Sequence, residues 1–169
     1  MSNQKQSPVA VLMGSDSDLP TMEACIKQLK DFGIDPIVRI LSAHRTPAVA
    51  CEFAANAGDN GVKVIIAAAG MAAHLAGAMA AHTSLPIIGV PIDSSCLQGM
   101  DALLATVQMP PGVPVATMAI GKSGARNAGI LAVQILALAD AVLAERLDKY
   151  KQDMAAKVEQ KAKALQNAS

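Results

Sequence analysis

Residues 37–47 read IVRIL followed by SAHRTP, so that an apolar run leads into a polar cluster and then into a proline. The apolar run has the pattern of a β-strand. Pro47 suits the first turn of a helix, because its fixed φ fits there and its missing N–H would be unpaired anyway. The polar residues therefore lie on a short connection after a strand, and in a parallel sheet such connections form the edge where ligands bind.

Ser42, His44 and Arg45 bring three kinds of chemistry to this connection. A hydroxyl can hold an anion, an imidazole can transfer protons near neutral pH, and a guanidinium can bind a phosphate or carboxylate through two hydrogen bonds. A single histidine is usually a core residue with satisfied hydrogen bonds. The position of His44 between Ser42 and Arg45 at the end of a strand favours a functional role.

The rest of the chain alternates short apolar runs with helical patterns. The expected strands are residues 9–13, 37–41, 62–68, 86–90 and 115–120, and the expected helices are residues 20–32, 48–57, 74–81, 99–107 and 125–139. Repeated strand and helix units make right-handed crossovers, so the pattern predicts an α/β fold with a parallel sheet covered by helices on both faces. Ser17 or Asp18 is expected to cap the first helix.

The chain is expected to form a single domain over residues 1–169, with a polar tail at residues 1–7. Residues 140–169 read mainly as a long charged helix. Its apolar positions are Leu143, Leu147, Tyr150, Met154, Val158 and Leu165. They make a narrow stripe, for which a neighbouring subunit is the natural cover. The alternative is a helix that folds back on its own domain.

The composition favours a cytoplasmic protein that binds a small molecule. Apolar residues make up 52% of the chain, but there is no Trp, one Tyr and two Phe, so small aliphatic side chains must build the core. The 14 basic and 14 acidic residues balance without a basic stripe, which argues against nucleic acid. No leader or membrane-length apolar run is evident. Three widely spaced cysteines suit free thiols in a cytosol.

Two further loops after strands carry candidate binding residues. The first, GSDSD at residues 14–18, stands at a helix amino end, where Ser15 can face a phosphate and Asp18 can accept hydrogen bonds from sugar hydroxyls. Plain helix capping by Ser and Asp is the alternative. In the second loop, His74 either caps the following helix or lines a pocket.

Other motifs fail on their spacing. Gly121-Lys122-Ser123 resembles the end of a phosphate-binding loop, but position 116 is Ala where that motif needs Gly. The histidines and cysteines show no paired metal-ligand spacing, and no dinucleotide-binding glycine motif occurs. The sequence therefore predicts neither a nucleoside triphosphate site nor a metal site.

Four motifs together resemble the N5-carboxyaminoimidazole ribonucleotide mutase family of bacterial purine biosynthesis. They are GSDSD at 14–18, SAHRTP at 42–47, GMAAHL at 70–75 and QMPPG at 108–112. The likeness runs from about Val9 to Ala139. The resemblance implies a three-layer flavodoxin-like fold and a homo-octamer with active sites at subunit junctions. It implies no cofactor: neither ATP, metal nor biotin.

The resemblance also implies a reaction and a set of site residues. The carboxylate of the substrate moves from the exocyclic nitrogen to the adjacent ring carbon. His44 matches the catalytic imidazole. The implied substrate-binding residues are Ser15, Asp18, Ser42, Arg45, Gly70, Ala72, His74 and Leu75, and the small residues Gly70, Ala72 and Ala73 can enclose carbon dioxide.

Two alternatives stay open. A second class of similar sequence carboxylates aminoimidazole ribonucleotide directly with free carbon dioxide, and it carries an Arg-Ser-containing segment where this chain has Met71-Ala72-Ala73-His74. The other alternative is a non-enzymatic nucleotide-binding module of flavodoxin-like architecture. Such a module has no need of a histidine beside an arginine that binds phosphate.

Overall fold

The computed structural model describes residues 6–167 and contains a five-stranded sheet. The strands are β1 (Val9–Met13), β2 (Ile37–Ile40), β3 (Val64–Gly70), β4 (Ile87–Ile92) and β5 (Ala116–Thr117). They lie in the order β2-β1-β3-β4-β5, and each neighbouring pair is parallel. This is the strand order of flavodoxin, so the predicted flavodoxin-like α/β fold is confirmed.

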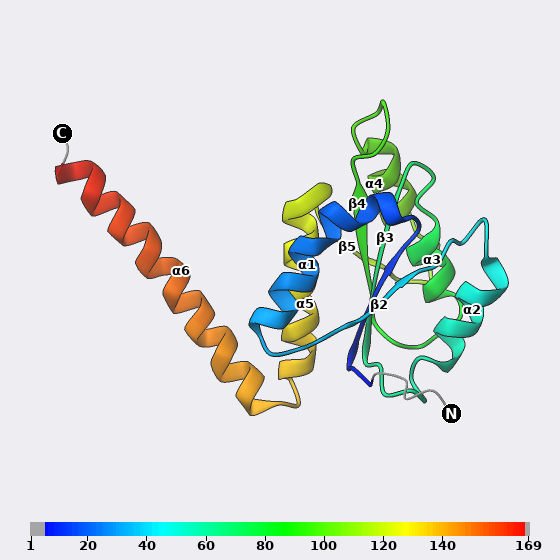
Figure 1. Cartoon of the computed structure of the whole chain (residues 1–169), viewed down its shortest axis with the longest axis horizontal. Coiled ribbons are helices and arrows are strands. Elements are labelled where there is room, and N and C mark those ends of the chain that lie inside the picture. The colour runs from blue at the N-terminus through cyan, green and yellow to red at the C-terminus, as the bar shows by residue number, and fades with distance from the viewer. Residues whose placement is uncertain (1–5, 168–169) are drawn as a thin grey trace. The chain divides into compact units, whose positions relative to one another are not determined.

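Helices cover both faces of the sheet (Figure 1). They are η1 (Asp16–Asp18), α1 (Leu19–Asp31), α2 (Pro47–Asn56), α3 (Leu75–Ala80), α4 (Met100–Val107) and α5 (Gly121–Ala137), followed by α6 (Ala141–Asn167). The helices α1 and α5 lie on one face, and α2, α3 and α4 lie on the other. Right-handed crossovers require this division, because the chain runs from β1 to β2 in one direction and then to β3, β4 and β5 in the other.

The chain divides into two compact units, residues 1–132 and residues 133–169. The first contains the sheet and most of α5, and the second contains α6. The expectation of a single domain stays a prediction.

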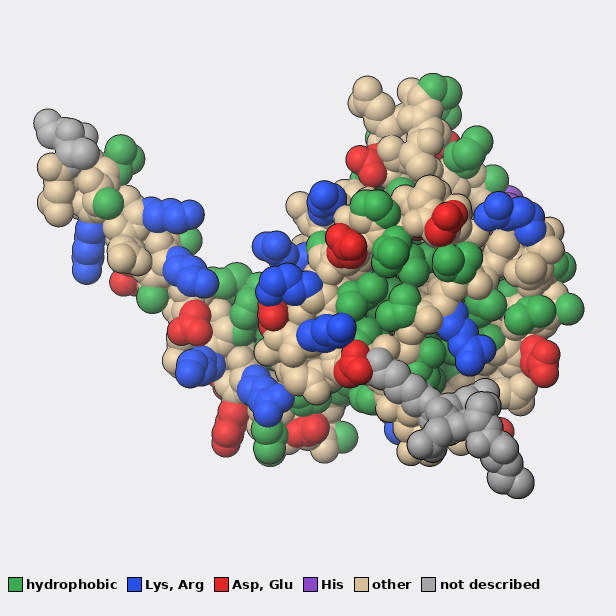
Figure 2. Space-filling view, viewed as in Figure 1, with side chains coloured by type: hydrophobic (Ala, Val, Ile, Leu, Met, Phe, Trp, Pro, Cys, Tyr) green, Lys and Arg blue, Asp and Glu red, His purple; other side chains and the backbone are tan. Residues whose placement is uncertain are grey.

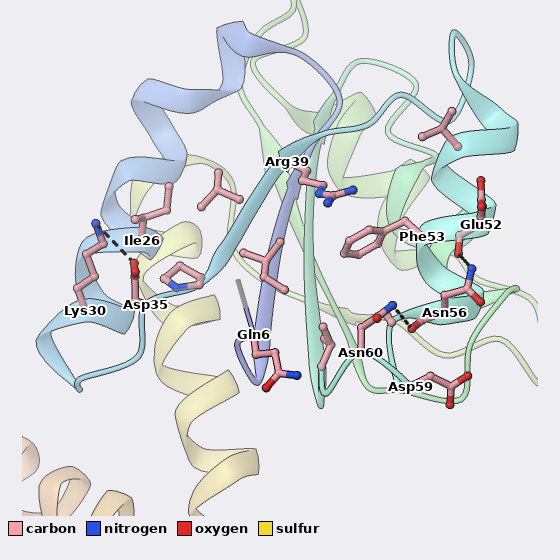
Figure 3. Close-up of a pocket in the computed structure, with 16 residues that line it drawn as sticks. Gln6, Ile26, Lys30, Asp35, Arg39, Glu52, Phe53, Asn56, Asp59 and Asn60 are labelled. Carbon is pink, nitrogen blue, oxygen red and sulfur yellow. Dashed lines mark hydrogen bonds and ion pairs between the residues drawn. The ribbon is translucent and has the colours of Figure 1, made fainter. Parts of the chain in front are cut away.

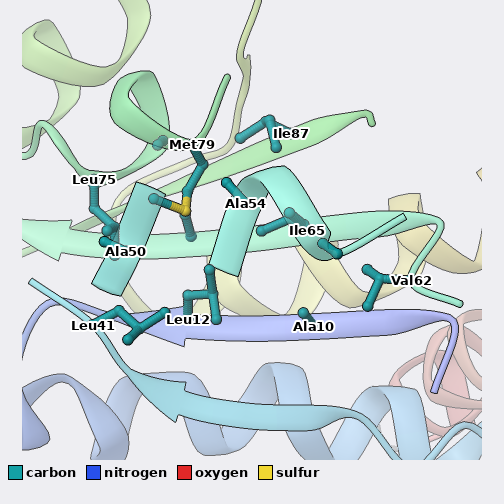
Figure 4. Packing of buried hydrophobic residues seen from close by; sticks show 13 residues of the cluster. Ala10, Leu12, Leu41, Ala50, Ala54, Val62, Ile65, Leu75, Met79 and Ile87 are labelled. Atoms are coloured by element: carbon teal, nitrogen blue, oxygen red, sulfur yellow. The ribbon is translucent and has the colours of Figure 1, made fainter. Parts of the chain in front are cut away.

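The core is built from small aliphatic side chains, as the composition predicts. Figure 4 shows the cluster between the sheet and the helices α2 and α3. Its members include Ala10, Leu12, Ala50, Ala54, Ile65, Leu75 and Met79. The alanines of α2 let that helix approach the sheet closely, which fixes the loop before α2 against the loop after β1.

The predicted element boundaries need several corrections. The third strand begins at Val64 and not at residue 62, because the amides of Lys63 and Val64 both donate to the carbonyl of Pro8 as the chain enters the sheet. Gly70 belongs to this strand, where it pairs with Ile92, and does not open the following loop. The helices α3 and α6 differ from their predicted ranges by one to three residues at their ends.

The fifth strand is much shorter than the predicted range 115–120. It pairs with β4 only through Ile88 and Gly89, although the amide of Met118 still donates to the carbonyl of Gly89 at 2.9 Å. Proline has no N–H to give to a ladder, and the strand is preceded by a proline-rich connection at residues 110–114. The chain turns at Gly121, with φ of 77°, and α5 begins there instead of at residue 125.

Ser15 provides the cap that the sequence assigned to Ser17 or Asp18. Its Oγ accepts a hydrogen bond from the amide of Ser17 at 3.3 Å, and its own amide donates to Asp18 Oδ2 at 3.1 Å. This reciprocal pair is a capping box on the short helix η1 that precedes α1. Asp18 makes no side-chain capping bond to α1 itself.

Candidate functional site

The strand order predicts a ligand crevice at the carboxyl ends of β1 and β3. From β1 the chain crosses to β2 on one side, and it returns to β3 on the other side of β1. Loops that leave two such strands diverge and open a crevice between them. The loops after β1, β2 and β3 carry the residues that the sequence singled out, at positions 14–18, 42–46 and 71–75.

His44 and His74 form a pair across this crevice. His44 Nε2 and His74 Nδ1 lie 2.9 Å apart, and the rings meet edge to face at 82° with their centroids 5.0 Å apart. One nitrogen must donate and the other must accept, so a single proton occupies the contact. The pair therefore links two imidazoles through one hydrogen bond, and both side chains are exposed at the crevice, where a ligand can reach them.

Arg45 joins the loop after β2 to the loop after β1. Its Nη2 donates to the carbonyl of Gly14 at 2.6 Å, and its Nε donates to Ser42 Oγ at 3.3 Å. A guanidinium carries five N–H groups, of which these contacts use two. The remaining donors can bind a phosphate or carboxylate, and the two existing contacts hold the plane of the guanidinium in place.

Thr46 stabilises the loop that carries these groups, although the sequence did not mark it as a site residue. Its Oγ1 accepts a hydrogen bond from the amide of Ser42 at 3.0 Å and lies 3.2 Å from the carbonyl of Ser42. Ser42 Oγ in turn accepts from the amide of Arg45 at 3.1 Å. A serine and a threonine four residues apart before a helix-starting proline are the signal that identifies such a loop.

Asp18 lies beneath the loop after β1 and is only 4% exposed. Burial raises the pKa of its carboxyl above the ordinary value of 3.8, and this effect outweighs the hydrogen bonds from the amides of Ser15 and Gly14 and the nearby positive charge of Arg45. Its Oδ2 accepts from the amide of Ser15. Asp18 therefore organises the loop that presents Ser15.

The segment from Gly70 to Leu75 approaches the crevice from β3. Gly70 lies so close to Ser94, in the loop after β4, that a Cβ at this position would overlap Ser94 Oγ. Ala72 and His74 are exposed, whereas Leu75 is 2% exposed and its side chain packs in the core cluster. Ser94 was not among the residues that the sequence singled out.

A groove of about 680 Å³ runs along β2 between α1 and α2 (Figure 3). Arg39 lies in it over the ring of Phe53, with Cζ 5.4 Å from the ring centroid. Hydrophobic side chains gather over β2 on the face seen in Figure 2, between charged side chains. None of the predicted site residues lines this groove. The crevice at the strand ends is the better candidate, because it brings the imidazoles and the guanidinium together.

Residues 6–167 contain no cluster of three or more His, Cys, Asp or Glu side chains arranged to hold a metal ion. No helix in the same range is both long and apolar enough to cross a membrane. The three cysteines are free thiols, as predicted, with Cys25 buried and Cys96 exposed.

Fold and site together define an α/β protein of flavodoxin topology that carries an imidazole pair and an arginine in its ligand crevice. A family model described as AIR carboxylase matches residues 8–157. The N5-carboxyaminoimidazole ribonucleotide mutase of Pyrococcus abyssi is 52% identical over 146 residues, which cover 86% of this chain and 83% of that protein. The mutase of Bacillus subtilis is 51% identical over 148 residues, which cover 88% and 91%.

A solved structure agrees with these sequence matches. The crystal structure of PurE from Treponema denticola has a TM-score of 0.81 at 29% sequence identity, and the match covers 90% of this chain and 94% of that one. The chain belongs to the AIR carboxylase family. The resemblance drawn from the four sequence motifs is therefore confirmed.

Proposed function

We propose that this chain is an isomerase that converts N5-carboxyaminoimidazole ribonucleotide into 4-carboxy-5-aminoimidazole ribonucleotide in purine biosynthesis. The observation that carries the proposal is about 50% identity to mutases of this name over most of the chain. Met71-Ala72-Ala73-His74 also follows the mutase pattern and not that of the direct carboxylases.

His44 acts as the general acid and base of the proposed reaction. As imidazolium it protonates the exocyclic nitrogen, the bond from that nitrogen to the carboxylate carbon breaks, and carbon dioxide leaves. The ring carbon then attacks carbon dioxide and forms the new carbon bond. Neutral His44 removes the proton from that ring carbon, which restores the imidazolium and balances the cycle. The exposure of His44 at the crevice supports this role.

The nucleotide contacts come from the loops on either side of β1. Arg45 binds the phosphate with the N–H groups that Gly14 and Ser42 leave available. Ser15 adds a hydroxyl from the start of η1, and Ser42 belongs to the same binding loop as Arg45. Asp18 accepts a ribose hydroxyl with Oδ1, while Ser15 holds Oδ2.

The loop after β3 retains carbon dioxide between the two half-reactions. Gly70, Ala72 and Ala73 have no side chain larger than a methyl group, so they can lie close against a small apolar molecule. His74 contacts His44 and closes one side of the pocket. Leu75 supports this segment from the core.

The chain acts as a homo-octamer in the cytoplasm. Each chain contributes one α/β domain, and α6 packs on a neighbouring subunit. The exposed apolar side chains of α6, which include Met154 and Val158, support this packing.

An assay on purified protein without ATP tests the proposed reaction. One arm supplies N5-carboxyaminoimidazole ribonucleotide at low bicarbonate, and the other supplies aminoimidazole ribonucleotide with bicarbonate. We expect rapid conversion in the first arm and slow, bicarbonate-dependent conversion in the second. Conversion that is faster in the second arm identifies a direct carboxylase, and binding without conversion in either arm identifies a nucleotide-binding module.

A further inference from the structure

Met71 has a backbone conformation that is unusual for its residue type. Its φ is 54°, in the left-handed region, and Gln98 with φ of 53° is the other non-glycine residue with positive φ within residues 6–167. Few non-glycine residues adopt this region, and those that do are held there by their surroundings. The side chain of Met71 is 61% exposed, so packing of that side chain does not explain the conformation.

The conformation of Met71 starts a tight reversal that ends at His74. The amide of Ala73 donates to the carbonyl of Met71 at 2.9 Å, and the amide of His74 donates to the carbonyl of Ala72 at 2.8 Å. Each of these bonds spans only two residues, as in γ-turns. His74 then precedes α3 directly, and its carbonyl accepts from the amide of Ala78 at 2.9 Å. Between the end of β3 and the start of α3, the backbone has little freedom.

Both ends of this reversal are fixed. Gly70 pairs with Ile92 in the sheet and lies against Ser94, so the start of the loop cannot shift. Leu75 is buried in the core cluster, so the end cannot shift either. The direction in which the imidazole of His74 leaves the loop therefore depends on the backbone angles in between, of which the positive φ of Met71 is the unusual one.

We propose that Met71 is a positioning residue whose left-handed backbone, and not its side chain, sets the imidazole of His74 against that of His44. The inference rests on the proposed function, in which His44 carries out the proton transfers. Its physical basis is the 2.9 Å contact between the two rings, which a small rotation of the loop breaks. Displacement of a group beside the reacting atoms by about 1 Å can cost a hundredfold in rate.

Two substitutions separate the backbone of Met71 from its side chain. Met71→Asn removes the apolar side chain but favours a left-handed φ, because Asn adopts this region more readily than other non-glycine residues. Met71→Val keeps an apolar side chain but opposes a positive φ, because branching at Cβ crowds that conformation. We expect the Asn variant to keep kcat within about twofold and the Val variant to lose about ten- to a hundredfold.

Gln98→Val is the matched control, because it opposes an almost identical φ in the loop after β4. We expect the thermal midpoints of Gln98→Val and Met71→Val to fall by a similar few degrees. Of these two variants, only Met71→Val should lower kcat. Loss of activity in Met71→Asn together with near-normal activity in Met71→Val would overturn the proposal, since the side chain would then be the important part. An equal loss of kcat in Gln98→Val would also overturn it.

A second measurement does not depend on turnover. Ring ¹⁵N and ¹H NMR signals of His44 and His74 report the hydrogen bond between them in the free protein, whatever reaction the chain catalyses. We expect Met71→Asn to keep these signals and Met71→Val to shift them toward those of separate imidazoles. If Met71→Val leaves the signals unchanged, the positioning role is wrong even if the mutase activity is present. If the signals change as expected and no mutase activity exists, the proposed function is wrong and the positioning role stands.

Discussion

At the scale of single residues, His44 has the strictest chemical requirement in the proposed reaction, because there it must both give and take a proton. His44→Asn keeps much of the shape of the side chain but cannot transfer protons at neutral pH. We expect it to lower kcat at least about a hundredfold with little effect on substrate binding. His82→Asn is the control, since His82 lies in the turn after α3, where its Nδ1 is 2.8 Å from the carbonyl of Ala78. Retention of a substantial part of kcat in His44→Asn would contradict the proposed role.

Arg45 depends on its planar shape as well as its charge. Arg45→Lys keeps the positive charge but loses the planar fork that spans Gly14 and Ser42 and that we propose to bind the phosphate. We expect substrate affinity, measured by calorimetry at moderate salt, to fall about tenfold or more. Arg39→Lys is the matched control, because Arg39 lies over Phe53 in the groove along β2 and outside the crevice. Equal affinities for Arg45→Lys and Arg39→Lys would exclude a phosphate contact by Arg45.

Asp18 gives the protein a pH dependence with a definite sign. Burial raises the pKa of this carboxyl in the folded state above 3.8, so between that value and the raised one the folded state holds a proton that the unfolded state has lost. The contribution of Asp18 to stability therefore falls as the pH rises through this window. Asp18→Asn removes the ionisation and can still accept from the amide of Ser15.

Urea unfolding at pH 3.5 and pH 7 measures this effect. We expect the difference in the free energy of unfolding between Asp18→Asn and the wild-type protein to be more favourable to the variant at pH 7 than at pH 3.5. Asp59→Asn removes an exposed carboxylate from another loop and controls for the loss of one charge. If the variant instead loses stability relative to the wild-type protein as the pH rises, the hydrogen bonds to Asp18 affect its pKa more than its burial does.

The sequence identified the residues of the candidate site but not their arrangement in space. Ser42, His44 and Arg45 could be identified because they stand between a strand pattern and a helix-starting proline, which is a local signal. The contact between His44 and His74 joins residues that are 30 positions apart, so only the packed sheet determines it. The burial of Asp18 and the left-handed φ of Met71 likewise depend on neighbours that no local pattern reveals.

At the scale of secondary-structure elements, apolar runs located β1, β3 and β4 because a strand buried on both faces has few polar residues. Their ends were harder to predict, since they depend on hydrogen-bond partners elsewhere in the chain. The strand β5 shows this most clearly, because its two residues pair only where Ile88 and Gly89 are available. The cap at Ser15 was missed for a different, local reason, because the short helix η1 precedes α1 and the capping residue therefore lies before η1.

The start of α5 depends on Gly124, which lies outside the helix that the sequence predicted at residues 125–139. A Cβ at Gly124 would overlap the carbonyl of Ala119, which is backbone and cannot rotate away. We expect Gly124→Ala to lower the free energy of unfolding by about 1–3 kcal/mol, measured by urea unfolding. Gly58→Ala is the control, because a Cβ at that position would meet no atom within 4 Å, and it should be neutral or slightly stabilising. Equal changes in the free energy of unfolding for Gly124→Ala and Gly58→Ala would show that the turn before α5 accommodates a Cβ easily.

At the scale of the whole molecule, the apolar positions of α6 fall into two groups. Leu143 and Leu147 are buried within the chain, whereas Met154 and Val158 are 44% and 68% exposed and Leu165 is 72% exposed. Full burial of one such side chain stabilises by roughly 1.5–3 kcal/mol. The second group can therefore contribute to assembly without being needed for the fold of a single chain.

Two paired substitutions test whether this second group holds the proposed octamer together. Met154→Lys with Val158→Lys places two charges on the exposed apolar stripe and leaves Leu143 and Leu147 in place. Gln152→Lys with Gln160→Lys adds the same charge at polar positions, which lie on the opposite side of the helix from the stripe because of the helical period. We expect light scattering to show smaller assemblies for the first pair only, since burial of an unpaired ammonium at an interface is costly. An octamer that persists with Met154→Lys and Val158→Lys would place the interface elsewhere and leave α6 peripheral.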